Sequence, residues 1–158
     1  VVEINGLEIS ESKSPLTQTY VVRNGDLNIN NDIKYNLDTN ILGAFILKRF
    51  PSAAFIVIDG NINIHKDVEQ LDGVFIAIDT DNEGDDGKIN SNEISYKQLT
   101  INGILVGDVS DLFENRRFVG DISQDEGSVT IKFSENFLLN TPPGLSELLD
   151  LTQLRVAY

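Results

Sequence analysis

The pattern of apolar and polar positions contains a unit that occurs almost twice. Residues 20–33 have the sequence YVVRNGDLNINNDI, and residues 55–68 have the sequence FIVIDGNINIHKDV. In each copy an apolar run meets Asn-Gly or Asp-Gly, and a segment of alternating apolar and polar residues follows. This order predicts a strand, a sharp bend and a second strand. One such unit cannot bury its apolar face alone, so the recurrence favours a structure in which copies stack on one another.

Short strands are expected along most of the remaining chain. Residues 74–78 form a nearly continuous run of β-branched and aromatic residues, which indicates a strand buried on both faces. Residues 1–10 alternate weakly around Asn5-Gly6 and predict a first strand pair. Further apolar segments, which predict additional strands, are 94–101, 104–107 (after Asn102-Gly103) and 127–134, the last with Val129, Ile131 and Phe133 on one face.

Helical signals are weak in this sequence. No segment longer than about ten residues has a convincing helical period. Residues 41–50, ILGAFILKRF, are an apolar run closed by Lys48, Arg49 and Pro51. We expect this run to form a short helix or irregular segment that covers one end of the core, and we expect residues 33–40 to form an exposed loop.

The chain is therefore predicted to be all-β, and two architectures compete. A β-solenoid, similar to a parallel β-helix, stacks its turns in parallel with ladders of Asn and apolar residues. An antiparallel β-sandwich would use the Asn-Gly pairs as hairpin turns. The hairpin signal is locally strong, but G-x-[LI]-N-I recurs at equivalent places in the two units. This recurrence narrowly favours the solenoid.

Composition narrows the function classes. The length fits a single domain, 1–158, and 25 acidic residues against 12 basic ones leave a net charge of −13. This charge disfavours nucleic acid and anionic membranes and favours cations or basic partners. No apolar run is long enough for a membrane helix, and no signal-peptide pattern is present. Because the sequence lacks Met, we expect a processed protein or a segment of a longer surface protein, and because it lacks Cys, disulfides and thiolate sites are excluded.

Candidate chemistry is concentrated in residues 79–93, DTDNEGDDGKINSNE. Acidic residues at this density repel one another unless a hard cation lies among their oxygens, and Ca²⁺ takes roughly six to eight oxygen ligands. The second half of the segment matches an EF-hand loop, whereas the first half departs from it. We predict an EF-like calcium loop between strands, with a solvated acidic loop as the alternative. The candidate ligands are Asp79, Asp81, Glu83, Asp85, Asp86, a backbone carbonyl near Lys88, and Glu93.

A second, weaker candidate metal loop contains Asp121, Ser123 and Asp125. Its spacing begins a calcium loop, but Lys132 occupies the closing position. An ordinary turn before the strand at Val129 is therefore the default interpretation.

The remaining polar side chains are expected to be structural or solvent-exposed. His65, the only histidine, ends an alternating segment and is expected on the surface. Residues 115–117, Asn-Arg-Arg, form a local basic spot in an acidic chain. We expect this spot to pair with acidic side chains, namely Asp108, Asp111 or Asp121.

Six segments carry a resemblance to a group of bacterial proteins. They are YVVRNGDLNIN, AAFIVIDGNINI, EQLDGVFIAID, KQLTINGILVGDV, RRFVGD and IKFSENFLLNTPPG. In this order they resemble repeat-containing segments of uncharacterised bacterial secreted and cell-surface proteins, some with a pilus-associated architecture. The resemblance covers residues 20–144 and implies an extracellular, solenoid-like domain of a larger surface polypeptide. It supplies no catalytic residues, and it implies that the acidic loop is a local specialisation.

Together these observations predict a calcium-stabilised structural or adhesive β-domain of an extracellular surface or filament protein, without catalysis. Neighbouring domains or subunits of a surface assembly are the expected partners. One alternative is a calcium-dependent polysaccharide-acting enzyme that uses Asp79, Asp81 and Arg117 around the ion. Another is a carbohydrate-binding module with exposed Tyr or Phe in a row, although the chain has no Trp and only four tyrosines, Tyr20, Tyr35, Tyr96 and Tyr158.

Overall fold

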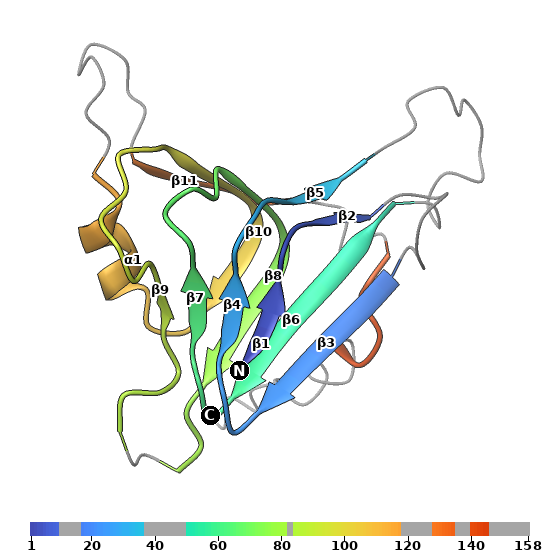
Figure 1. Ribbon diagram of the computed structural model, residues 1–158. Coiled ribbons are helices and arrows are strands. Elements are labelled where there is room, and N and C mark those ends of the chain that lie inside the picture. The colour runs from blue at the N-terminus through green and yellow to red at the C-terminus, as the bar shows by residue number, and fades with distance from the viewer. Residues whose placement is uncertain (10–16, 37–49, 82–83, 118–127, 135–139, 146–158) are drawn as a thin grey trace, which may run out of the picture.

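Short strands make up most of the chain that the computed structural model describes, which comprises residues 1–9, 17–36, 50–81, 84–117, 128–134 and 140–145 (Figure 1). Within these ranges, no helix has the length and apolar character needed to cross a membrane. The elements are β1 (Val2–Ile4), β2 (Leu7–Ile9), β3 (Thr17–Arg23), β4 (Leu27–Ile29), β5 (Ile33–Tyr35), β6 (Ser52–Ile58), β7 (Ile62–Ile64), β8 (Gln70–Ile78), β9 (Ile89–Asn90), β10 (Leu99–Val106), α1 (Ser110–Asn115) and β11 (Val129–Lys132).

All pairs between the described strands are parallel. One sheet has the order β1-β4-β7-β9, and the other has the order β11-β10-β8-β5-β2, with β3 and β6 joined to it through β8. The prediction of a mostly β chain is therefore confirmed. Parallel pairing fits the antiparallel sandwich less well, because sandwich hairpins place consecutive strands side by side in opposite directions.

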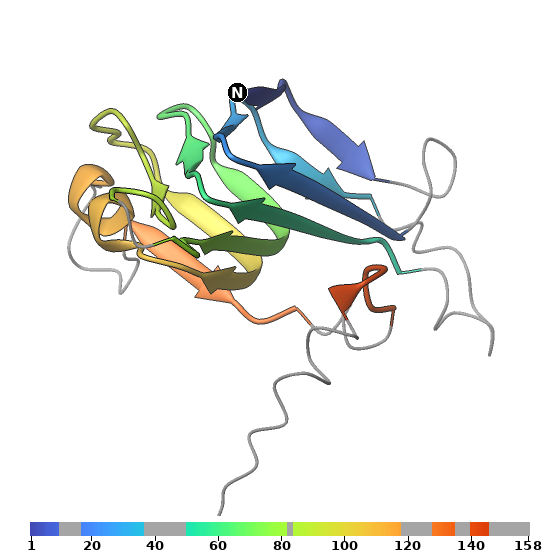
Figure 2. The ribbon, with the colours of Figure 1, turned by 90° about the horizontal axis from the view of Figure 1, so that it is seen from below.

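The sequence repeat corresponds to strand register. β3 pairs with β6, and β4 pairs with β7, so that Val22 lies opposite Val57 and Asn28 opposite Asn63. Equivalent residues of the two units are therefore neighbours in adjacent parallel strands. Parallel neighbours need a long connection between them, and here the chain passes through the other sheet before it returns. Figure 2 shows the resulting arrangement, in which strands from successive passages lie side by side.

The core lies between the sheets and is built from ladders of like residues. The side chains of Leu27, Ile62 and Ile89 are in register on β4, β7 and β9, and each is almost completely buried. Tyr20, Phe55 and Phe75 stack face to face, with ring centroids 5.1 and 5.0 Å apart. These contacts explain the apolar alternation in the sequence, because every second residue of each strand points inward. The core side chains that share this interior include Ile9, Leu27, Ile29, Ile33, Phe55, Val57, Ile62, Ile64, Leu71, Phe75, Ile89, Leu99 and Ile101.

β8 and β10 are long enough to belong to two groups of strands. Their first halves lie in the group that contains β2, β5 and β11, and their second halves lie in the group that contains β3 and β6. Leu71, in the first half of β8, lies opposite Ile33 of β5, whereas Val74 to Ile78 lie opposite residues 54–58 of β6. The buried run 74–77 confirms the predicted strand that is apolar on both faces. The sequence suggested a bend at Asn102-Gly103. In the structure these two residues instead lie inside β10, opposite Asp72-Gly73.

Three boundary predictions require correction. β1 and β2 are not a strand pair; β1 pairs with β4 and β2 with β5, because the chain changes sheets at Gly6. The predicted loop 33–40 begins with β5, whose Ile33 is completely buried. The strand expected over 94–101 begins only at Leu99, and the side chain of Ile94 is exposed. Residues 37–49, which include most of the predicted short helix, lie outside the described residues.

The single described helix, α1, and the basic spot after it also differ from expectation. α1 has only six residues, too few to produce a recognisable helical period. Arg116 is buried, and among the described residues its guanidinium binds backbone oxygens: Nη1 donates to the oxygen of Val68 and Nη2 to the oxygen of His65, both at 2.8 Å. Asp121, one of the predicted acidic partners, lies outside the described residues. Asp108 instead accepts hydrogen bonds from Ser110. The His65 side chain is exposed, as predicted.

Candidate metal centre

Three carboxylates converge at the ends of β6 and β8. One oxygen from each of Asp59, Asp79 and Asp81 lies within 4.8 Å of the other two. Asp59 follows β6 and Asp79 follows β8, and the last residues of these strands, Ile58 and Ile78, are register partners. Because the strands are parallel, the residues that follow them emerge at the same edge of the sheet. The convergence is thus a direct result of strand register.

Thr80 holds the three carboxylates together. Asp59 Oδ1 accepts hydrogen bonds from the backbone N–H of Thr80 at 2.8 Å and from its hydroxyl at 2.7 Å. Thr80 stands between Asp79 and Asp81 in the sequence, so these two bonds place both neighbours beside Asp59. The backbone N–H of Asp81 also donates to Asp79 Oδ1 at 3.1 Å, which tightens the turn.

The backbone around Asp59 repeats that of the preceding unit. Asp59 has a φ of 55°, and Asn24, which occupies the equivalent position after β3, has a φ of 52°. Asn and Asp tolerate this left-handed conformation better than most residues. Each then donates its backbone N–H to the next strand along: Asn24 to the oxygen of Ile58 and Asp59 to the oxygen of Ile78, both at 2.9 Å. Asp59, the carboxylate that lies outside the acidic segment, is therefore placed by a turn that repeats the turn after β3.

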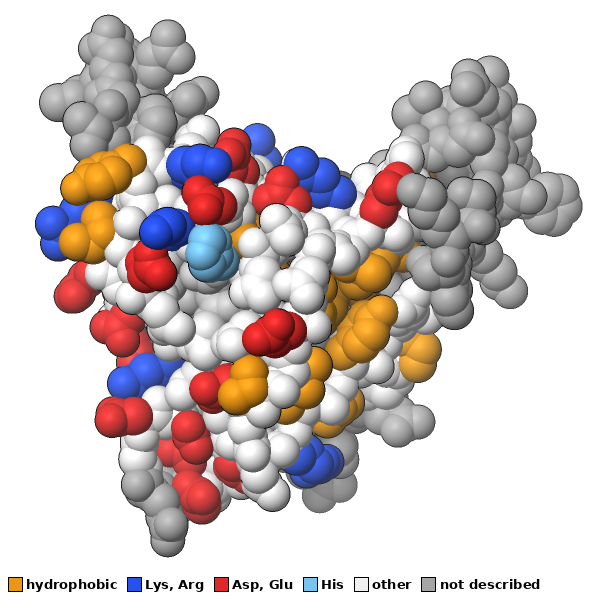
Figure 3. Space-filling model, viewed as in Figure 1, with side chains coloured by type: hydrophobic (Ala, Val, Ile, Leu, Met, Phe, Trp, Pro, Cys, Tyr) orange, Lys and Arg blue, Asp and Glu red, His pale blue; other side chains and the backbone are white. Residues whose placement is uncertain are grey.

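The electrostatics of this region favour a bound cation. Hydrogen bonds from the backbone N–H and then the hydroxyl of Thr80 lower the pKa of Asp59, so its carboxylate is ionised over a wider pH range. Partial burial, followed by the negative charges of Asp26, Asp79, Asp81 and Asp59, raises the pKa of Asp86. Figure 3 shows Asp and Glu side chains gathered over the segment that joins β8 and β9. The negative charges in this segment repel one another, and a cation would relieve that repulsion.

The donor set at this site is made of carboxylate oxygens. Oxygen ligands of this type suit the hard cations Ca²⁺, Mg²⁺ and Mn²⁺. Asp59 and Asp79 are half-buried, and Asp81 is exposed, so the site opens to solvent on one side. The cluster of Asp59, Asp79 and Asp81 can therefore hold one metal ion whose coordination is completed by water.

Only some of the predicted ligands in residues 79–93 belong to this cluster. Of the described ones, Asp79 and Asp81 are brought together with Asp59. The Asp85 side chain is 99% exposed, and its Oδ1 accepts from Lys88 Nζ at 3.2 Å. Glu93 Oε2 accepts from Lys66 Nζ at 2.5 Å.

The other predicted ligand positions are distributed differently. Asp86 Oδ1 lies 3.4 Å from Asn61 Nδ2, and the carbonyl oxygen of Lys88 accepts the backbone N–H of Ile62 at 2.8 Å. Glu83 and the second candidate loop, Asp121, Ser123 and Asp125, lie outside the described residues.

Asp59 is a candidate ligand that the sequence pattern does not reveal. The pattern identifies it only as the first residue of an Asp-Gly bend. The signal that could have found it is that each of the apolar runs 52–58 and 74–78 is followed directly by an Asp. If these two runs are parallel neighbours, Asp59 and Asp79 must follow them at the same edge.

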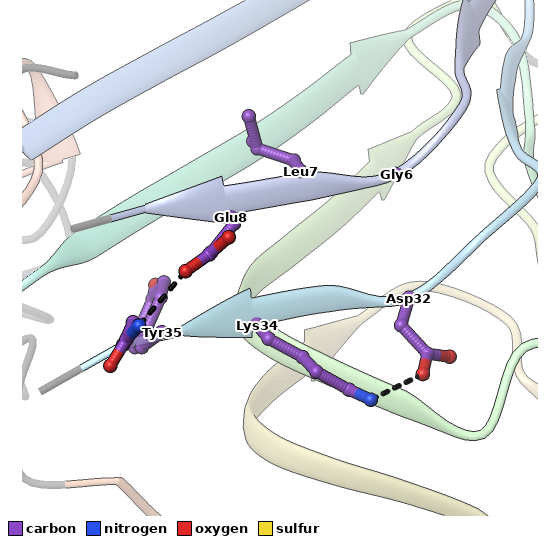
Figure 4. Close-up of a pocket in the computed structure, with 7 residues that line it drawn as sticks. Gly6, Leu7, Glu8, Asp32, Lys34 and Tyr35 are labelled. Carbon is purple, nitrogen blue, oxygen red and sulfur yellow. Dashed lines mark hydrogen bonds and ion pairs between the residues drawn. The ribbon is translucent and has the colours of Figure 1, made fainter. Parts of the chain in front are cut away.

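Figure 4 shows a pocket between β2 and β5, with a volume of about 480 Å³. Its polar side chains bind one another. Lys34 Nζ lies 2.7 Å from Asp32 Oδ2, and Asn36 Nδ2 donates to Glu8 Oε1 at 2.9 Å. These polar side chains are therefore engaged with one another, and the Asn36–Glu8 bond links β2 to the residue that follows β5.

The structure describes most of the residues that the two alternative functions would use. Arg117, the proposed partner of Asp79 and Asp81 in an enzyme, follows α1, and its backbone N–H donates to the oxygen of Ser95 at 2.8 Å. Of the tyrosines, Tyr20 stacks on Phe55, and the hydroxyl of Tyr35 accepts the backbone N–H of Ala53 at 2.7 Å. Tyr96 is 64% exposed, and Tyr158 lies outside the described residues.

Comparisons of this chain with protein-family models, with curated proteins and with solved structures give no match.

Proposed function

We propose that this chain is a non-catalytic, calcium-stabilised structural or adhesive domain of an extracellular surface or filament protein, built as a parallel β-solenoid. The observation that carries the proposal is the convergence of Asp59, Asp79 and Asp81. These carboxylates come from two successive turns, so an ion between them would connect one layer of the fold to the next. Metal binding that joins separate segments adds its free energy to folding.

The pairing of strands supports the solenoid. Leu27, Ile62 and Ile89 occupy one position in three successive strands of one sheet, and Arg23, Ile58 and Ile78 occupy one position in the other. Each passage of the chain thus adds a strand to both sheets. Stacking of this kind lets every layer bury its apolar residues against the next, which is the stabilising principle of repeat proteins.

Calcium is the cation that suits the site and the proposed setting. Mg²⁺ demands a near-octahedral arrangement and keeps several waters, whereas Ca²⁺ accepts irregular sets of carboxylates. Extracellular calcium modules bind with dissociation constants of about 10⁻⁴ to 10⁻³ M. The resemblance to bacterial surface proteins supports an extracellular location, where such an affinity is sufficient. The domain would then be rigid outside cells and less stable where calcium is scarce.

Thermal unfolding of the full chain tests the calcium proposal. Calcium should raise the melting temperature and EDTA should lower it. At a concentration roughly one hundred times the dissociation constant, bound calcium would add about 2.7 kcal/mol to the free energy of unfolding. Isothermal titration of the calcium-free protein should give one binding event.

Two matched variants locate the ion. Asp59→Asn keeps the size of the side chain and removes its charge, and it should abolish the calcium response. Asp85→Asn removes one charge from the same segment, but at a side chain that is 99% exposed and paired with Lys88. It should leave the response intact. Identical melting curves with calcium and with EDTA would overturn the calcium proposal.

A further inference from the structure

The two ends of the strand stack differ in how they are covered. At the end that contains β9, α1 packs beside that strand, and the side chain of Leu112 is completely buried in the core. At the opposite end, β1, β2 and β3 are the outermost described strands, and they pair with β4, β5 and β6 respectively. Figure 2 shows β3 at this end of the stack. Each of these three strands therefore has one edge that no other described strand pairs with.

The longest of these edges belongs to β3. β1 and β2 have three residues each, whereas β3 has seven. Asn24, which follows β3, donates its backbone N–H to the oxygen of Ile58 on β6. Because successive residues of a strand face opposite neighbours, the backbone groups of Tyr20 and Val22 also face β6. The backbone groups that face the free edge are those of Thr17, Thr19, Val21 and Arg23. A long unpaired edge of this kind is a template for pairing with another strand.

A row of stacked rings also ends at β3. Tyr20, Phe55 and Phe75 are register partners on β3, β6 and β8, and their rings stack face to face. Phe55 and Phe75 are completely buried, whereas Tyr20 is only half-buried. The hydroxyl of Tyr20 donates to the side chain of Gln18 on the same strand. Since the row follows the strand order, the outer side of the Tyr20 ring lies toward the free edge.

The outward face of β3 is apolar as well. Val21, Ile56, Ile76 and Val106 are register partners that line a groove of about 690 Å³. Leu145 packs on Ile56 and Ile76, but Val21 remains 53% exposed. A contiguous exposed apolar patch usually marks a contact surface. Both faces of β3 therefore offer apolar side chains beside its unpaired backbone groups.

We infer that two copies of this chain associate through β3, whose free edges pair antiparallel about a two-fold axis at Tyr20 and join the two sheets into one. The occupant of each free edge is thus β3 of the second copy. A two-fold contact requires a surface that is complementary to itself, and the residues of β3 meet this requirement.

The register of the pair follows from the limits of the strand. Tyr20 is the central residue of Thr17–Arg23. When the two strands overlap fully, Thr19 lies opposite Val21 of the second copy, and Thr17 lies opposite Arg23. These are the residues whose backbone groups face the free edge, so each of them gains a hydrogen-bonded partner. No like charges lie opposite each other, because Arg23 faces Thr17.

The same register continues the row of rings. Tyr20 lies opposite Tyr20 of the second copy at a non-hydrogen-bonded position, where Cα atoms are about 4.5 Å apart and side chains are closest. Both tyrosines point to the core side, since residues directly opposite each other share a face. Aromatic rings stack at centroid distances of about 4.5 to 7 Å. The two rows of three rings can therefore join into one, and the two apolar grooves meet at Val21.

Head-to-tail stacking of copies offers a poorer match to β3. The corresponding edge at the other end of the stack is the second half of β10, residues 103–106, which pair with residues 73–76 of β8. This segment is shorter than β3. Leu105 is the residue opposite Phe75, so Tyr20 would meet no ring of that strand. Pairing of β3 with itself uses all of its free backbone groups and also forms a closed dimer.

Cysteine substitutions test the register. The chain has no Cys, so a single substitution introduces one thiol. In the inferred dimer, residue 19 of one copy and residue 21 of the other have Cα atoms about 5.5 Å apart, within the range of a disulfide. Two copies of residue 19, or two of residue 21, are offset along the strands beyond the disulfide limit of about 7 Å. A mixture of Thr19→Cys and Val21→Cys should therefore form the mixed disulfide at least about ten times faster than either variant forms its own.

Sedimentation of the full chain tests the surface. The protein should form a dimer that dissociates on dilution, and Val21→Lys should raise the dimer dissociation constant at least about tenfold, because an edge lysine opposes strand pairing. Val106→Lys is the matched control. Val106 lines the same groove and is 47% exposed, but it lies on β10, away from the free edge. Its dissociation constant should stay within about twofold of the unchanged protein. Circular dichroism verifies that both variants fold, and the cysteine mixture decides if Val21→Lys does not.

Four results would overturn the inference. A monomer at all concentrations up to about 1 mM would mean that the edge does not bind a second copy. An unchanged dimer in folded Val21→Lys would place the contact elsewhere. A cysteine mixture without preference for the mixed disulfide would exclude the register at Tyr20. Particles that grow beyond a dimer with concentration would assign the edge to head-to-tail stacking.

Discussion

A Cβ atom on Gly103 would lie 1.7 Å from the backbone oxygen of Gly73, its register partner on β8. No real Cβ atom tolerates such a contact, so β8 and β10 can approach each other this closely only because residue 103 has no side chain. This close approach lies where both strands pass from one group of neighbours to the next. Glycine at position 103 is therefore a packing requirement of the sheet.

We predict that Gly103→Ala destabilises the protein although it removes no contact. The strands must separate to admit the methyl group, and overpacking of this kind costs about 1 to 3 kcal/mol or more. Gly84→Ala is the control, because a Cβ there would have nothing within 4 Å. The midpoint of urea unfolding in EDTA measures both effects. Equal midpoints for the two variants would show that β8 and β10 are farther apart than described.

Replacing Arg116 should destabilise the connection between α1 and the turn after β7. Arg116→Leu would leave the carbonyl oxygens of His65 and Val68 without their buried donor, at a cost of about 1 to 3 kcal/mol. Arg116→Lys should recover little, because one ammonium cannot reproduce the planar fork of guanidinium donors. Arg117→Ala, at the exposed neighbouring position, should change stability by no more than about 0.5 kcal/mol. The urea midpoint decides; similar values for Arg116→Leu and Arg117→Ala would contradict the prediction.

Glu93→Gln should leave calcium affinity unchanged. Glu93 would close an EF-like loop, but in the structure its carboxylate accepts from Lys66 Nζ. The ion is instead expected between Asp59, Asp79 and Asp81. Isothermal titration of Glu93→Gln beside Asp79→Asn separates the two arrangements. A large loss of affinity in Glu93→Gln would restore the loop arrangement and count against the stacked-turn site.

Asp86→Asn should raise the melting temperature of the calcium-free protein at neutral pH. Partial burial and the charges of neighbouring carboxylates raise the pKa of Asp86 in the folded state. A raised folded pKa means that the ionised group destabilises the fold above that pKa, and that the effect disappears as the pH falls below the unfolded pKa. The gain from Asp86→Asn should therefore vanish near pH 3. Melting curves in EDTA across the acidic range test this, and a gain that is independent of pH would assign it to another cause.

The sequence by itself determined where several of the strands and the bends between them lie along the chain. The recurrence of apolar runs and Asn-Gly or Asp-Gly bends identified β3, β4, β6 and β7, because inward residues must alternate in any strand that buries one face. It also located the concentration of acidic residues after Ile78. These features are local, so they are visible without knowledge of which strands pair.

Tertiary structure alone decided the pairing and the composition of the candidate site. Asn102-Gly103 has the local chemistry of a turn, yet it continues β10 because Gly73 lies opposite and leaves no room for a side chain. Asp59 lies twenty residues before Asp79, and only the register of Ile58 with Ile78 brings their carboxylates to one edge. Arg116 is buried for the same kind of reason, since the carbonyl groups that bind it come from a turn about fifty residues earlier. Contacts between distant segments depend on register, which no local pattern specifies.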